Sequence, residues 1–110
     1  MKNLTQPIHP GEILADELEA IGMTAAGLAV QIGVPKNRLY AIINEQRGMT
    51  ADTAMRLGVF FGTGPDLWLN LQKSYELDVA RQKIGDNLKA IKPYDKNLLS
   101  GQAGFALRNL

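Results

Sequence analysis

Hydrophobic residues recur every three or four positions through most of the chain, which is the spacing of one buried face of an α-helix. Glycines and prolines separate these periodic segments. Only the short run at residues 58–62 favours a strand, so the pattern as a whole is typical of an all-α protein. It predicts five helices, within residues 9–22, 23–33, 34–46, 51–62 and 63–85.

The ends of these segments carry residues that helices use at their termini. Thr24 and Thr50 are good N-caps, and His9 precedes a helix that begins at Pro10. Gly22 is suited to closing that first helix. The expected core combines the periodic apolar residues Leu14, Leu18, Ile21, Leu28, Ile32, Leu39, Ile42, Ile43, Ala54, Leu57 and Phe61.

The second and third segments have the spacing of a helix-turn-helix. Ala29 is small enough for two helices to cross closely, and Gly33 is free to adopt the positive φ that the turn requires. Pro35 fits the first position of the following helix. In such a pair the second helix presents its N-terminal residues to the major groove of DNA.

The start of this second helix carries side chains that are able to read bases. Lysine and arginine donate to guanine O6 and N7, and asparagine bridges adenine N6 and N7. Polar residues at the ends of the two helices are suited to holding phosphates. The same cluster also fits an ordinary solvated helix face. The predicted base-reading residues are Lys36, Asn37, Arg38 and Tyr40, and the predicted phosphate contacts are Thr24, Asn44, Gln46 and Arg47.

The pattern T-x-x-x-L-A-x-x-x-G-V-P-x-x-x-L-x-x-I, from Thr24 to Ile42, resembles the helix-turn-helix of the phage Cro and C1 repressor (XRE) family. The blocks HPGE, TADTAMRL and FFGTGPDLWLNLQ narrow the resemblance, over residues 8–80, to the HigA-type antitoxins of toxin–antitoxin modules. The resemblance implies an all-α, lambda repressor-like dimer that is not an enzyme. It also implies binding to an inverted repeat in the protein's own promoter. The implied protein partner is a HigB toxin, a ribosome-dependent mRNA endonuclease related to RelE, which such antitoxins neutralise by direct binding.

Three residues depart from the family's pattern. Ala25 stands where many relatives carry a glutamine that braces a phosphate, so the side chain for that contact is missing. Gly27 is a poor helix former and costs about 1 kcal/mol relative to alanine. Gly64 stands where relatives often have serine, so we expect a weaker cap on the fifth helix.

The fifth segment carries more apolar residues than a domain of this size buries. We therefore expect a two-fold dimer through this segment and the C-terminal tail. The predicted interface residues are Leu67, Trp68, Leu71, Tyr75 and Leu77. Of these, Trp68, Leu71 and Tyr75 are also expected to lie partly in the core of the protomer. The helix-turn-helix domain is expected to occupy residues 1–85. Residues 86–110 have no clear period and are expected to form an irregular or partly mobile C-terminal extension, docked through Leu98, Leu99, Phe105 and Leu107.

The formal net charge of this 110-residue chain is only +1, so bulk charge does not indicate nucleic-acid binding. Locally the charge is uneven, because residues 8–21 contain acidic residues and no lysine or arginine. An acidic helix can dock a basic toxin and steer its association, and it can equally be plain solvated surface. The candidate toxin-binding residues are Glu12, Asp16 and Glu19.

Composition argues against several other functions. With no cysteine and a single histidine, no metal site and no cofactor are expected. Ser74 and Ser100 have no visible base partner, so no catalytic residue is expected. Neither a signal peptide nor a bilayer-length apolar run is recognisable, which favours a cytoplasmic protein without a membrane partner. No small-molecule substrate is expected either.

Two alternatives remain open at this stage. The first is a stand-alone Cro/C1-type transcriptional repressor with no toxin partner. The second is a helix-turn-helix domain that serves only protein assembly and binds no promoter.

Overall fold

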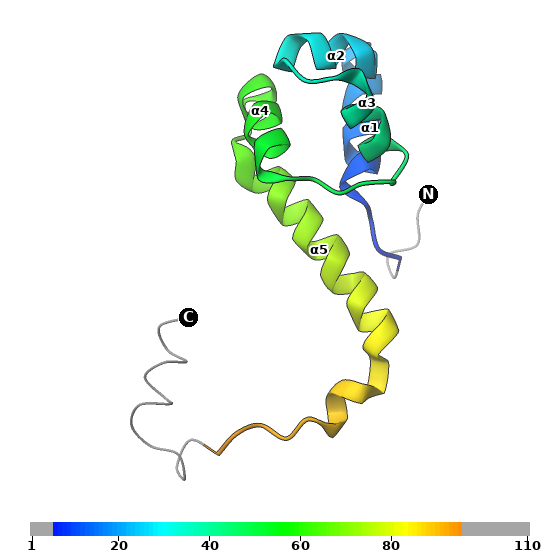
Figure 1. Ribbon diagram of the computed structural model, residues 1–110, viewed down its shortest axis with the longest axis vertical. Coiled ribbons are helices and arrows are strands. Elements are labelled where there is room, and N and C mark those ends of the chain that lie inside the picture. The colour runs from blue at the N-terminus through cyan, green and yellow to red at the C-terminus, as the bar shows by residue number, and fades with distance from the viewer. Residues whose placement is uncertain (1–5, 96–110) are drawn as a thin grey trace.

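The computed structural model describes residues 6–95, and its regular elements in that range are all helical (Figure 1). Five α-helices and one short 3₁₀ helix follow one another: α1 Pro10–Ile21, α2 Ala25–Ile32, α3 Lys36–Ile43, α4 Ala51–Phe61, α5 Pro65–Ile84 and η1 Gly85–Ala90. The predicted all-α, five-helix fold is confirmed. No helix in residues 6–95 combines the length and apolar character needed to cross a membrane.

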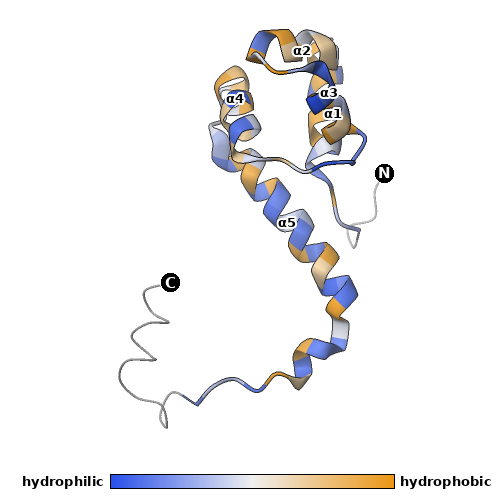
Figure 2. Ribbon diagram, viewed as in Figure 1, coloured by the Kyte–Doolittle hydropathy of each residue, from blue (hydrophilic) through white to orange (hydrophobic). Residues whose placement is uncertain are grey.

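The first four helices form a rounded body, and α5 leaves it as a long arm (Figure 1). Within the body every α-helix contributes a fully buried side chain to one core, which contains Leu14, Leu28, Leu39, Ile42, Leu57 and Trp68. Polar and apolar residues alternate along the arm (Figure 2). The core therefore fixes the body, including α2 and α3, while much of α5 stays outside it.

The helix ends follow the predicted caps. His9 Nδ1 accepts a hydrogen bond from the Gly11 N–H at 2.9 Å, and Thr24 Oγ1 accepts one from the Gly27 N–H at 3.0 Å. Thr50 caps α4, and Gly64 gives α5 no side-chain cap, as expected. These caps satisfy backbone donors that a helix leaves unpaired in its first turn.

Some apolar positions differ from the predicted core. Ile21 is 48% exposed because it is the last residue of α1, where Gly22 turns the chain away. Ile43 and Phe61 are only partly buried and pack against the edge of the core. The strand-like run at 58–62 is helical, since it forms the end of α4 and its glycine cap.

Trp68 corrects the predicted dimer interface. Its side chain is 1% exposed within a single protomer, and its ring lies beside that of Phe61, with centroids 5.7 Å apart. A residue already enclosed by its own chain offers almost no surface to a second copy, so Trp68 belongs to the core.

At two glycines the backbone of one element lies directly against the backbone of another, with no room for a side chain between them. A Cβ atom on Gly11 would overlap the carbonyl oxygen of Ile42, which brings α1 against the end of α3. A Cβ atom on Gly58 would overlap the carbonyl group of Gly64, which brings α4 against the start of α5. Both contacts hold the elements around α3 in place.

The C-terminal extension begins with regular structure. Residues 85–90 form η1, whereas an irregular segment was predicted from residue 86, and their side chains are exposed. The proposed docking residues Leu98, Leu99, Phe105 and Leu107 lie outside the described residues.

Candidate nucleic-acid interface

The turn between α2 and α3 has the predicted glycine geometry, but Pro35 is the N-cap of α3 in an extended conformation and not its first residue. Gly33 adopts φ 73° and ψ 39°, a left-handed conformation that glycine reaches without a Cβ penalty. The Val34 N–H then donates to the Ala29 carbonyl at 3.0 Å, which closes α2. Ala29 is buried at the crossing of the two helices. The turn therefore sets the angle at which α3 leaves α2.

The two sides of α3 have opposite roles. Leu39 and Ile42 are fully buried and anchor the helix in the core. Lys36, Asn37 and Tyr40 are exposed, with Tyr40 at 42%. Three of the four predicted base-reading side chains therefore project from the body on a helix whose other side is held by the core.

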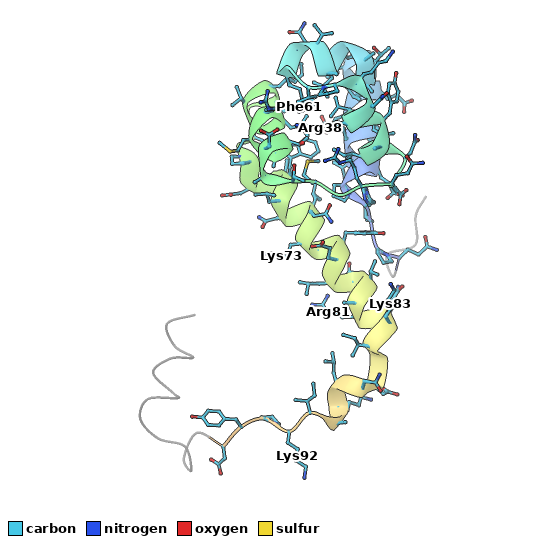
Figure 3. The ribbon with its side chains drawn as sticks, in the orientation of Figure 1. Arg38, Phe61, Lys73, Arg81, Lys83 and Lys92 are labelled. Atoms are coloured by element: carbon cyan, nitrogen blue, oxygen red, sulfur yellow. The ribbon has the colours of Figure 1, made fainter. Side chains whose placement is uncertain are left out.

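Arg38, the fourth predicted base reader, has a partner inside the protein. Its Nη1 lies 2.6 Å from Oδ2 of Asp52 on α4, and its side chain is 28% exposed. Figure 3 shows Arg38 in the space between α3 and α4. Arg38 thus joins α3 to α4, a role that the sequence prediction did not include.

Arg56 joins the same network from α4. Its Nε donates to Asp52 Oδ2 at 3.1 Å, and its Nη1 donates to the carbonyl oxygens of Ile32 and Gly33 at 2.8 and 3.3 Å. These carbonyls lie at the C-terminal end of α2, which leaves acceptors unpaired. Arg56 therefore connects α4 directly to the turn of the helix-turn-helix.

The arginines also affect the charge state of Asp52. The hydrogen bond from Arg38 lowers the pKa of Asp52 below its ordinary value, and Arg56 lowers it further. Asp52 is consequently a carboxylate at neutral pH. The network carries two positive charges and one negative charge.

Asp52 and Arg56 were missed as site residues. They stand four residues apart on a predicted helix, a spacing that favours an ion pair on one face. That spacing could have singled out the pair. The partner on α3 could not be found in this way, because Arg38 and Asp52 are brought together only by the packing of α3 on α4.

The four predicted phosphate contacts are all exposed. Thr24 lies at the start of α2, and Asn44, Gln46 and Arg47 follow the end of α3. Thr24 accepts a hydrogen bond with its oxygen, so its hydroxyl hydrogen remains to donate. Glu45, which lies between Asn44 and Gln46, has φ 62°, and this positive φ turns the chain sharply after α3.

The N-cap residue of α1 and side chains of α5 lie beside the segment that follows α3. The buried ring of His9 packs edge-on against Tyr75 at 4.8 Å, and Gln72 Oε1 accepts from the Met49 N–H at 2.7 Å. Burial lowers the pKa of His9, although Glu45 and a backbone hydrogen bond with Arg47 oppose the shift. Tyr75, predicted at a dimer interface, therefore already uses part of its ring surface in the contact with His9.

The acidic candidates on α1 are not equivalent. Asp16 and Glu19 are exposed, as is Glu17, whereas Glu12 is partly buried in the first turn. Residues 6–95 contain no cluster of three or more histidine or acidic residues that could hold a metal ion.

Comparisons with known proteins agree with this architecture. No model of a protein family matches the chain. The chain is 34% identical over 93 residues to antitoxin HigA-1 of Vibrio cholerae, which covers 84% of this chain and 88% of that protein. The structure of an addiction module antidote protein of the HigA family from Coxiella burnetii aligns with a TM-score of 0.78 at 50% identity, over 81% of this chain and 99% of that one.

A third comparison concerns a structure that contains DNA. Pseudomonas aeruginosa antitoxin HigA, solved with the higBA promoter, aligns with a TM-score of 0.76 at 41% identity, over 82% of this chain and 100% of that one. The similarity to these proteins spans most of their length and includes the helix-turn-helix. The chain therefore belongs to the HigA family of antitoxins.

Proposed function

We propose that the protein is an antitoxin that represses its own operon by binding an inverted-repeat operator through α3. The observation that carries this proposal is the exposure of Lys36, Asn37 and Tyr40 on a helix whose opposite side is fully buried. The likeness to a HigA antitoxin solved with promoter DNA supports it. The proposed role is binding in the cytoplasm, without catalysis or a cofactor.

The chemistry of this face suits DNA. Lys36 and the free N–H groups of Arg38 can donate to guanine, and Asn37 can pair with adenine. Tyr40 offers a ring edge and a hydroxyl group beside them. Thr24, Asn44, Gln46 and Arg47 would hold phosphates on either side of the groove and fix the register of α3.

We further propose a two-fold dimer through α5, which would place two copies of α3 about 34 Å apart on one side of the duplex. Leu67 and Leu77 are 44% and 46% exposed, and Leu71 and Tyr75 on the same helix are partly buried. Apolar side chains exposed along one helix are better covered by a second copy than left in water. The interface proposed here uses these four residues and omits Trp68.

The proposed protein partner is a HigB-like, RelE-related toxin. An enzyme that cleaves mRNA needs a basic surface for its substrate, and the exposed Asp16 and Glu19 on α1 would attract such a surface. Glu12 would contribute less because it is partly buried. Changing Asp16 and Glu19 together to lysine should weaken toxin binding without altering operator binding. Unchanged toxin affinity would contradict this docking face.

A stand-alone repressor of the same fold is the main alternative, and one experiment separates it from an antitoxin. The chain is co-expressed with the product of the neighbouring reading frame, and the purified material is tested in a gel shift on the promoter of the same operon. Co-purification with a promoter shift is the expected result. A shift without co-purification favours the stand-alone repressor, and no shift favours a protein-assembly domain.

A further inference from the structure

Asp52 holds one end of Arg38, a proposed base-reading residue. Its Nη1 is held at 2.6 Å by Asp52, while 28% of its side chain remains exposed. A guanidinium group has five N–H donors in one rigid plane, so binding through Nη1 leaves others to face outward. The bound arginine is therefore both occupied and still able to donate.

The position of Asp52 is itself fixed. It lies in the first turn of α4, and its Oδ2 also accepts from Arg56 Nε at 3.1 Å. Arg56 in turn donates to the carbonyl groups of Ile32 and Gly33 in the turn before α3. The Nη1 end of Arg38 is thus connected through Asp52 to α4, and through Arg56 to the end of α2.

We propose that Asp52 is a specificity-determining residue for DNA, which orients Arg38 so that the free edge of its guanidinium meets a base rather than a phosphate. This inference rests on the proposed function of α3. An unrestrained arginine is a long flexible cation, and phosphates of any sequence attract it. A restrained arginine presents its fork in one direction, which is what bidentate donation to guanine requires.

The consequence concerns discrimination more than affinity. Removal of the Asp52 carboxylate frees Arg38 and deletes a negative charge near the DNA. Affinity for random DNA should then stay equal or rise, while affinity for the operator falls. The ratio of the two affinities should drop by about fivefold to tenfold, which is part of the discrimination that a bidentate base contact contributes.

The test measures the affinity of the full chain for a duplex from its own promoter and for a random duplex of the same length, at one salt concentration. The variants are Asp52→Ala, Asp52→Asn and Arg38→Ala, with thermal melting to establish that each is folded. Asp66→Ala is a matched control, because Asp66 also follows the first residue of its helix and has no ion pair within the described part of the chain.

The expected order of the affinity ratio is wild type, then Asp52→Asn, then Asp52→Ala. Asparagine keeps an acceptor for Arg38 and should rescue part of the effect. In an Arg38→Ala background, Asp52→Ala should have no further effect on the ratio, and Asp66→Ala should match the wild type.

Two results overturn the inference and are distinguishable from each other. If the wild type prefers its promoter and Asp52→Ala keeps the same ratio, Asp52 only joins α3 to α4, and the proposed function stands. If the wild type shows no preference for its promoter, the proposed function fails and this inference fails with it. Should Asp52→Ala not fold, the ratio for Asp52→Asn decides alone.

Discussion

At the scale of single residues, the polar start of α3 divides into two kinds of side chain. Lys36, Asn37 and Tyr40 are exposed, whereas Arg38 is held by Asp52. The sequence shows the residue types, but the division depends on which helix packs beside each one. When each helix is considered alone, the four predicted base-reading residues therefore cannot be told apart.

Lys36→Ala should weaken operator binding by about 1–3 kcal/mol if Lys36 reads a base. Its effect on random DNA should be much smaller, because no specific base contact is lost there. Arg47→Ala is the matched comparison, since a phosphate contact should weaken both duplexes alike and reduce the salt slope by about 1. Fluorescence anisotropy on both duplexes measures these losses. Equal losses for Lys36→Ala would reassign it to phosphate binding.

His9 should make stability depend on mildly acidic pH. Burial lowers its pKa, so the unfolded chain binds a proton more readily than the folded chain. No effect is expected above the ordinary value of 6.5, and stability should fall as the pH drops from there through the lower folded pKa. Protonation also removes the Nδ1 acceptor that caps α1.

Urea unfolding between pH 8 and pH 5 measures this effect against His9→Asn. Asparagine is a good N-cap that does not titrate, so the variant should lose less stability over this interval. The difference between the two pH profiles gives the contribution of His9, because the carboxylates, Glu45 among them, and Arg47 are present in both proteins. Parallel pH profiles would contradict the assignment.

At the scale of elements, periodicity and caps predict the helices because both signals are local. Thr24 and Gly33 mark the ends of α2 by chemistry that depends on a few neighbouring residues. The errors occur where a residue meets another element. Trp68 is apolar and lies on a helix with surplus apolar residues, but only its packing beside Phe61 shows that it belongs to the core.

Gly58→Ala should destabilise the fold by about 1–3 kcal/mol or more, because the added methyl group overlaps the Gly64 backbone between α4 and α5. Val59→Ala is the matched control. Val59 adjoins Gly58 on the same helix but is 85% exposed, so its truncation should change stability by about 0.5 kcal/mol or less. Chemical denaturation measures both. Equal stabilities would show that the backbones separate without cost.

At the scale of the whole molecule, near-neutral charge is compatible with DNA binding. The acidic residues of α1 lie on a different element from Lys36 and Arg38 of α3 and from Arg47, which follows α3. Figure 3 shows further cations, Lys73, Arg81 and Lys83, along α5 and away from α3. Arg81 is paired with Asp78 at 2.9 Å. The net charge of +1 thus conceals separate acidic and basic regions.

The proposed dimer would also be a property of the whole molecule. Leu77→Asp should convert the proposed dimer to a monomer, because it places a charge in an apolar interface on the exposed arm of α5. Operator affinity should fall with it, since one copy of α3 reaches only one half-site. Val59→Asp, on the exposed side of α4, should leave the dimer intact. Light scattering at micromolar concentration reports both states, and a monomeric wild type would contradict the interface.

The central claim is that α3 reads the sequence of the protein's own promoter. Anisotropy titrations of the wild-type chain on promoter and random duplexes, repeated over a series of salt concentrations, test it most directly. Affinity for the promoter should exceed that for random DNA by about 10³ or more, and both should fall as salt rises. Equal affinity for the two duplexes at every salt concentration would contradict the claim.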